Sequence, residues 1–213
     1  MIPQYTITAP PESEPLTLSE ASEHLRVDSA DDAGLITALI SVAREQADAL
    51  TGHVSAVTSY KLIAPSWAAL CGQETNPSYY RARDVGELLN CITLFRSPLA
   101  SVESIKYIAS GDSALTAIDD AEYAVITAAR PGIIQMLAAL PNLADRPDAI
   151  QIEFTAGYDG ETNIIPPTLK HLVKMLVAHF YETRNPIAFS TPSEIPLTIQ
   201  HLVNFNRIRG WVA

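Results

Sequence analysis

DDAGLITALISVAREQADALTG, residues 31–52, is the stretch that decides how the rest of the chain is interpreted. Its apolar side chains recur every three or four residues without a break, which predicts one long amphipathic helix. Asp31 and Asp32 lie in the first turn, where the helix dipole favours anions, and Asp28 or Ser29 is expected to cap it. Gly52 stands where a left-handed C-cap residue belongs. The apolar positions are Leu35, Ile36, Leu39, Ile40, Ala43, Ala47 and Leu50.

Further helices are predicted on both sides of this stretch. Upstream, Thr17 and Glu20 have the spacing of a capping box, which begins a helix of about two turns over residues 18–26. Downstream, Pro166-Pro167 precedes a second complete apolar stripe, and proline is acceptable in a first helical turn. A last helix ending at Gly210 is predicted from the spacing of Ile199, Leu202, Val203 and Ile208.

Between the helical segments, residues 53–165 have a different pattern. Short runs rich in Val, Ile, Thr and aromatic residues are separated by turn clusters such as Gly157-Tyr158-Asp159-Gly160, which predicts strands. Residues 150–154 alternate as a half-exposed antiparallel strand does, and there is no βαβ rhythm. Residues 68–87 are expected to form a loop. The predicted strands cover residues 54–64, 88–95, 102–108, 123–126 and 149–155.

These patterns predict an α+β fold. N- and C-terminal helices are expected to form a helical bundle core, with a β-rich antiparallel insertion between them. Residues 1–16 contain four prolines and are expected to be an extended N-terminal segment. The helical core is assigned to residues 17–52 and 166–213, and the β-rich insertion to residues 53–165.

No motif in the sequence supports catalysis, a metal or a cofactor. The five histidines show no His-Glu-x-x-His spacing, and there is no Gly-x-Ser-x-Gly elbow, no P-loop and no Gly-x-Gly-x-x-Gly. Cys71 and Cys91 are too few for a disulfide scaffold or a Cys-based zinc site and are expected to be free thiols in a reducing cytosol. We therefore expect a protein that is not an enzyme and has no cofactor. Carboxylates that are distant in sequence can still come together in the folded protein to form a catalytic site, so an uncharacterised enzyme stays open as an alternative.

Membrane association is not expected either. No apolar run approaches the roughly 18 residues of a membrane-spanning helix. The start, Met1-Ile2-Pro3-Gln4-Tyr5, lacks the basic and apolar regions of a signal peptide. Both observations favour an intracellular product with no membrane partner.

The charge of the chain is strongly negative and unevenly distributed. The 24 acidic residues outnumber the 14 Lys and Arg residues, for a net charge of −10, which argues against broad binding to DNA phosphates. Residues 1–52 hold nine acids and two bases, residues 53–165 thirteen and seven, and residues 166–213 two and five. An acidic front and a basic end could be complementary between neighbouring copies in a head-to-tail ring, or could be an ordinary polarised surface.

Several short segments occur in an order that is typical of one protein family. Leu16-Thr17-Leu18-Ser19-Glu20-Ala21 is followed by His24-Leu25-Arg26-Val27-Asp28 and by the long helix that ends at Gly52. Five further segments come later in the chain, in this order: Ser97-Pro98-Leu99-Ala100-Ser101-Val102, Ser104-Ile105-Lys106-Tyr107, Arg146-Pro147-Asp148-Ala149-Ile150, Phe154-Thr155-Ala156-Gly157-Tyr158 and residues 176–184. From about residue 16 to residue 211, this combination resembles the tailed-phage head–tail connector (adaptor or head-completion) family, in particular its longer members with a β-rich insertion.

The resemblance implies a structural protein of a phage or prophage virion. Such connectors form a ring with copies of themselves, dodecameric in the particle, on the portal protein of a DNA-filled head. The ring joins the head to a stopper or tail-completion protein, and DNA passes through the channel without specific binding. The implied location is the head–tail junction of the virion, after synthesis in the bacterial host cytoplasm. Another neck or tail-completion component of a tailed phage is the alternative.

The acidic front suggests a role for its carboxylates in such a ring. We expect them to form a channel or rim that repels DNA phosphates, so that DNA slides without sticking. The residues chosen for this role are Glu20, Glu23, Asp28, Asp31 and Asp32.

The basic end suggests a docking segment. Arg207, Arg209 and Trp211 are expected to dock on the portal, because Trp and Arg are enriched at the energetically dominant positions of interfaces. In the alternative reading, Trp211 folds back on its own helix and the two arginines stabilise the helix C-terminus.

Overall fold

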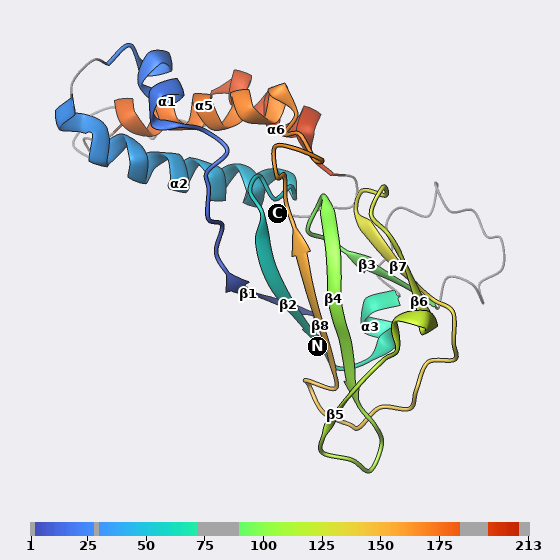
Figure 1. Cartoon of the computed structure of the whole chain (residues 1–213). Coiled ribbons are helices and arrows are strands. Elements are labelled where there is room, and N and C mark those ends of the chain that lie inside the picture. Colours follow the sequence, from blue (N-terminus) through green and yellow to red (C-terminus); the bar gives the residue numbers. More distant parts are fainter. Residues whose placement is uncertain (1–2, 28–29, 72–89, 184–195, 209–213) are drawn as a thin grey trace. The chain divides into compact units, whose positions relative to one another are not determined.

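The computed structural model describes residues 3–27, 30–71, 90–183 and 196–208. The chain divides into two compact units, each made from separate pieces of the sequence (Figure 1). The β unit consists mainly of Met1–Pro11 and Val57–Gly157, and the helical unit mainly of Glu12–Ala56 and Tyr158–Trp211.

The helical unit begins with the predicted capping box. Helix α1 (Leu18–Leu25) starts after Thr17, whose Oγ1 accepts a hydrogen bond from the Glu20 N–H at 3.2 Å. The Glu20 carboxylate in turn accepts one from the Thr17 N–H at 3.1 Å, so both backbone donors are satisfied. The helix ends at Arg26, whose left-handed conformation (φ 57°) directs its N–H back to the carbonyl oxygens of Glu23 and Ser22. The predicted helix is confirmed.

The long predicted helix is also confirmed. A short 3₁₀ turn (Ala30–Asp32) leads into α2 (Ala33–Thr51), which ends at Gly52 in the left-handed region (φ 79°). The Gly52 N–H donates to the Asp48 carbonyl at 2.9 Å. The proposed caps Asp28 and Ser29 lie outside the described residues, and Asp32 at the N-cap makes no side-chain capping bond.

One apolar core holds the helical unit together. Helices α5 (Pro167–Glu182) and α6 (Leu197–Asn206) complete it, and α2 packs along α5 while α1 and α6 contact both. Burying each large aliphatic side chain stabilises the unit by about 1.5–3 kcal/mol. The fully or nearly buried members are Leu16, Ala21, Ile36, Ile40, Ala43, Ala47, Tyr158, Leu169, Leu172, Val173, Leu176, Val177, Ile199 and Val203.

The β unit contains two antiparallel sheets. The first has five strands in the order β1 (Gln4–Ala9), β2 (Thr58–Ala64), β8 (Ile150–Ala156), β4 (Leu99–Ile108) and β5 (Leu115–Ala117). The second has the order β3 (Cys91–Leu94), β7 (Gly132–Met136) and β6 (Tyr123–Ile126). A 3₁₀ turn (Asp120–Glu122) precedes β6, and a short helix, α3 (Trp67–Cys71), contacts β2 and β3.

Alternating burial fixes the register at the centre of the larger sheet. Every second residue of β2 and of β8 is buried, and Tyr60 lies opposite Phe154 while Leu62 lies opposite Ile152. The two rings of Tyr60 and Phe154 stack with centroids 5.5 Å apart. A slip of one residue would turn these side chains to the solvent face, so the pattern specifies the pairing.

The expected fold class is wrong in its organisation, although the protein is broadly α+β. Five α-helices and two antiparallel sheets occur among the described residues, and the β structure is not an insertion between terminal helices. Strand β1 precedes every helix and pairs with β2, and α3 lies within the β unit. The prolines around residues 4–9 predicted an extended segment but gave no sign of its strand partner; none lies inside β1, and an edge strand tolerates proline at its ends. Tyr5 anchors this strand: its ring meets Phe154 edge-on at 6.2 Å, and its hydroxyl accepts the Phe95 N–H.

Most predicted strands are confirmed with shifted ends, and three were missed. The missed strands are β1, β5 and β7. Strand β5 has three residues, all exposed, and β7 has five residues directly after the turn cluster at Pro131, so both are too short for a clear alternating pattern. The expected loop at 68–87 overlaps α3, and residues 72–89 lie outside the described residues.

The two sheets meet closely at Gly132 of β7. A Cβ atom there would lie 2.5 Å from the Leu99 Cβ of β4, a distance that real Cβ atoms do not reach. We expect Gly132→Ala to destabilise the β unit by about 1–3 kcal/mol, because Leu99 is fully buried and cannot move aside freely. Urea unfolding followed by tryptophan fluorescence, to which the buried Trp67 contributes, measures the change.

Gly34→Ala is the matched control for this prediction. Gly34 lies in the first turn of α2 with open space around its Cα, so alanine should be neutral or slightly stabilising there. Equal effects of the two substitutions would contradict the close approach of the sheets at Gly132.

Candidate functional site

The acidic residues of the predicted channel or rim have different environments. The Glu20 carboxylate accepts a hydrogen bond from Lys170 Nζ at 2.6 Å, in addition to its part in the capping box. Asp32 accepts the Tyr181 hydroxyl, whereas Glu23 and Asp31 are exposed. Asp28 lies outside the described residues. Glu20 and Asp32 therefore hold helices of this unit together, and Glu23 and Asp31 present charge to solvent.

The contact between α1 and α5 is electrostatically sensitive. The Lys170 ammonium, then the Thr17 N–H, lower the pKa of Glu20 to about 2. One turn away, the rings of His24 and His171 meet edge-on with centroids 6.2 Å apart. Burial, together with the nearby His171 and Lys174, lowers the pKa of His24. Both shifts have the same consequence: the α1–α5 contact is favoured at neutral pH and loses stability as the pH falls.

The predicted docking residues are only partly described. Arg207 follows α6 directly and is exposed, while Arg209 and Trp211 lie outside the described residues. The Ile208 N–H donates to the Thr51 carbonyl at 2.9 Å, and Asn206 accepts the Thr168 hydroxyl at 2.7 Å. These bonds hold the end of α6 against the end of α2 and the start of α5, so the position of Arg207 is well defined within the unit.

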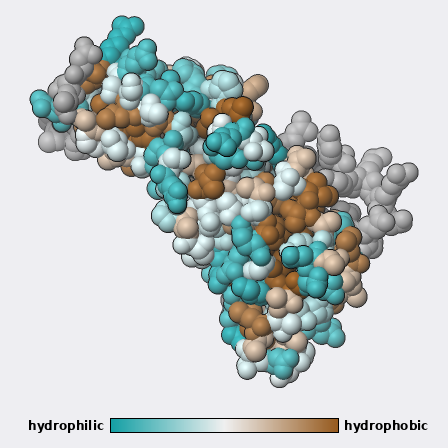
Figure 2. Space-filling view, viewed as in Figure 1, coloured by the Kyte–Doolittle hydropathy of each residue, from teal (hydrophilic) through white to brown (hydrophobic). Residues whose placement is uncertain are grey.

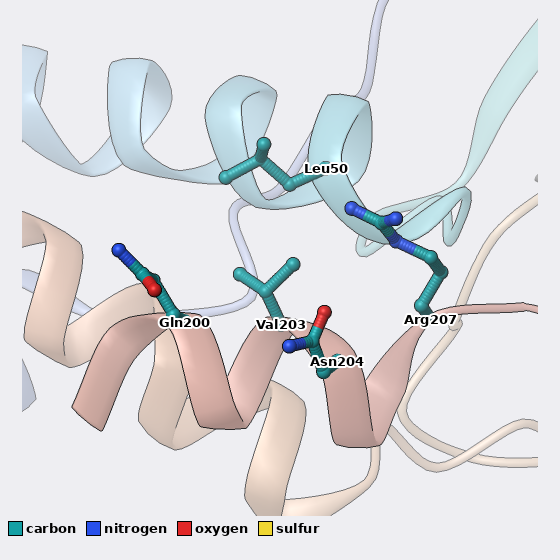
Figure 3. A pocket seen from close by; sticks show the side chains of 5 residues that line it. All are labelled: Leu50, Gln200, Val203, Asn204 and Arg207. Atoms are coloured by element: carbon teal, nitrogen blue, oxygen red, sulfur yellow. The ribbon is translucent and has the colours of Figure 1, made fainter. Parts of the chain in front are cut away.

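An open groove lies beside Arg207, between α2 and α6 (Figure 3). We call it the α2–α6 groove and define it by Leu50, Gln200, Val203, Asn204 and Arg207. The side chains of Leu50 and Val203 face each other and form an apolar floor, while the two amides and the guanidinium form a polar rim. Its volume is about 270 Å³, and its shape and lining suit one apolar side chain with polar surroundings better than a cofactor.

The exposed side of α6 is unusual in two respects. First, its ten residues include no Asp, Glu, Lys or Arg, in a chain of which 18% is charged. Second, Phe205 and Leu197 remain 77% and 72% exposed, and Phe205 is the most exposed large hydrophobic residue described. Depletion of charge around an exposed aromatic is typical of an interface core. The exposure of Phe205 could have been predicted from the sequence, because Phe205 lies outside the apolar stripe that predicted the helix.

Helix α2 carries further exposed apolar residues. Leu35 and Val42 are on its solvent side, and Figure 2 shows hydrophobic residues over α2 between hydrophilic ones. Scattered apolar residues are normal on a protein surface. The α2 side chains therefore single out no site by themselves.

The described part of the chain contains no group of three or more His, Cys, Asp or Glu residues that could hold a metal ion. None of its helices is long and apolar enough to cross a membrane.

No protein-family model matches this sequence, and no curated protein sequence matches it significantly. Solved structures do match, over nearly the whole chain. A chain from the neck of an empty gene transfer agent (GTA) particle, computed with C6 symmetry, aligns with a TM-score of 0.70 and 18% identity, covering 96% of this chain and 95% of that one. Chains from the virion of the native gene transfer agent particle and from its neck computed with C12 symmetry align with TM-scores of 0.67 and 0.66, at 18% and 17% identity. This chain has their fold.

The likeness concerns both units at once. Coverage of 96–98% of this chain, and of 95–96% of the others, includes the helical unit and the β unit together. At this identity the fold is shared and individual side chains are not comparable.

The ion pair between Glu20 and Lys170 should be measurable as a pH-dependent coupling. Lys170→Met and Glu20→Gln, singly and together, form a double-mutant cycle in which Gln keeps the capping box. We expect a coupling of about 0.5–1 kcal/mol at pH 7, because both side chains are about one-third exposed and the ion pair is screened. The coupling should be fully present above pH 4.5 and decline toward pH 2, as Glu20 becomes protonated.

Urea unfolding at a series of pH values provides the four free energies of the cycle. A coupling that stayed constant from pH 7 to pH 2 would contradict an ion pair at this position.

Proposed function

We propose that this protein is a structural component of the neck of a phage-like virion. It forms a ring on the portal, connects the DNA-filled head to a stopper or tail, and lets DNA pass through its channel. The observation that carries the proposal is the full-length match of both units to chains from gene transfer agent particles, two of them from the neck.

The symmetry of the matching structures supports a ring. The two necks were computed with C6 and C12 symmetry, so their chains occur in rotationally symmetric assemblies. A closed ring needs two different, complementary surfaces on each copy. The acidic residues 1–52 and the basic residues 166–213 supply opposite charges for such a contact.

Within the proposed ring, exposed carboxylates keep DNA from adhering. Glu23 and Asp31 are the described members of the acidic set that face solvent, and Glu20 and Asp32 position the helices that carry them. Negative charge along a channel repels phosphates at distances of about a Debye length, roughly 8 Å at physiological salt. DNA then slides past without specific contacts.

The end of α6 is the proposed attachment to the portal. Arg207 is exposed, and its place at the end of α6 is held by the bonds of Ile208 and Asn206. Arg209 and Trp211 follow it in the sequence and would extend the same contact. Arg and Trp are the residue types that most often dominate binding energy.

The position of the protein in the particle can be measured directly. Purified protein is added to portal-bearing heads from the same genome that lack it, and the vertices are imaged by electron microscopy. A ring of new density directly below the portal is the expected result. Density farther along the neck, or at the tail, would favour the alternative of another neck or tail-completion component. No added density at any vertex would overturn the proposal.

The acidic channel has its own test. Glu23→Lys with Asp31→Lys should slow DNA ejection from the particles that assemble, because the reversed charges now attract phosphates. Ejection rates are measured by dye fluorescence on triggered particles at several salt concentrations, and the defect should shrink as salt rises.

Glu122→Lys with Glu161→Lys is the control with the same change in net charge. Both residues are exposed, and neither belongs to the acidic set. If the two double variants eject DNA at the same rate, Glu23 and Asp31 do not face the channel.

A further inference from the structure

We infer that Phe205 of one copy inserts into the α2–α6 groove of the next copy, so that the copies associate head to tail. This inference rests on the proposed function in one respect only, namely that the partner is a second copy of the same chain. It names the contact that the proposed ring would use.

The Phe205 side chain, which we call the knob, and the α2–α6 groove lie on opposite sides of helix α6. Val203 lines the floor of the groove, and Phe205 follows it by two residues, which is a rotation of about 200° around an α-helix. Arg207 returns to the groove side two residues later. Phe205 is therefore directed away from the groove of its own chain and cannot fill it.

Each surface has the properties that the other requires. Phe205 is 77% exposed, so a large aromatic side chain is available for burial. The groove offers an apolar floor, Leu50 and Val203, in a space of about 270 Å³.

The surroundings of the knob also fit an interface between copies. Helix α6 exposes only uncharged side chains besides His201, namely Leu197, Thr198, Gln200, Asn204 and Phe205. No lysine or carboxylate of this helix would have to be desolvated when a second copy covers it. Charged residues are depleted in interface cores for this reason.

The opposite directions of knob and groove determine the symmetry of association. If the Phe205 of one copy enters the groove of a second, the Phe205 of the second copy is directed away from the first. A reciprocal twofold dimer is thus excluded for this contact, and the copies continue head to tail until the rotation closes a ring.

Two variants separate the two halves of the contact. Phe205→Ser removes the knob and keeps the groove. Asn204→Trp places a large ring on the exposed rim, closes the groove and keeps the knob; Gln200→Trp serves the same purpose if Asn204→Trp does not fold. Ile164→Ser is the matched control, because Ile164 is 70% exposed in the same unit but lies outside α6 and the groove. Circular dichroism verifies that each variant retains its helices.

Self-association is measured by sedimentation velocity over a wide range of protein concentrations, for each variant alone and for mixtures. We expect Phe205→Ser and Asn204→Trp each to weaken self-association at least about tenfold, and Ile164→Ser to leave it unchanged. An equimolar mixture of the first two variants retains one intact knob and one intact groove. It should form dimers with wild-type affinity and no larger species.

The outcomes distinguish this inference from the proposed function. In one outcome, wild-type protein joins portal-bearing heads, and Phe205→Ser and Asn204→Trp join them equally well and self-associate normally. This result overturns the inference alone. Loss of association in one variant without rescue in the mixture indicates a twofold contact and also overturns it. Self-association with the expected rescue, but no binding to heads, supports the inference and overturns the portal role. A wild-type chain that neither self-associates nor joins heads overturns both.

Discussion

The antiparallel pairing of β2 with β8 is the constraint on which both units depend. Thr58 lies opposite Ala156, so the β-unit segment 57–157 begins and ends on neighbouring residues of adjacent strands. Closing a flexible loop of a hundred residues costs conformational entropy that grows with its length. Pairing of β2 with β8 holds the two ends of this segment side by side, so the chain leaves the β unit close to where it enters. Helices α2 and α5 can then bury Ile36 and Ile40 with Leu172 and Leu176 in one core. The units are discontinuous in sequence for this reason.

The helical unit combines a conventional interior with an unconventional surface. Its core is mainly aliphatic, and two of its ion pairs, Glu20 with Lys170 and Glu14 with Arg44, join segments far apart in the sequence. Helix α6 instead exposes Phe205 on the side opposite the α2–α6 groove and contains no Asp, Glu, Lys or Arg. A monomer gains nothing in solubility from this arrangement. A chain that is covered by another copy gains apolar burial there without losing the hydration of a charge, which is the physical basis of the proposed contact.

Local chemistry explains which features could be predicted from the sequence. The Thr17–Glu20 capping box and the left-handed Gly52 depend on residues a few positions apart, and both appear as expected. Strand β1 could not be predicted in the same way, because five of its six residues are exposed and only its partner β2 shows that it is a strand. The acidic set was chosen by charge alone. The fold divides it, since Glu20 and Asp32 receive partners from α5, about 150 positions later in the chain.

The sequence by itself determined α1, α2, the start of α5 and most of the strands, because periodicity, capping and turn chemistry act over neighbouring residues. It did not predict α3, and the last helix ends at Asn206 rather than at Gly210, because Arg207 has an extended backbone. The sequence also indicated a chain without a catalytic motif whose charge is divided between an acidic front and a basic end. Only the tertiary structure decided that β1 joins the five-stranded sheet, that two of the acidic residues hold helices together, and that Phe205 and the α2–α6 groove lie on opposite sides of one helix. Each of these depends on contacts between residues distant in sequence, and the free energy of such contacts exists only once the chain has brought them together.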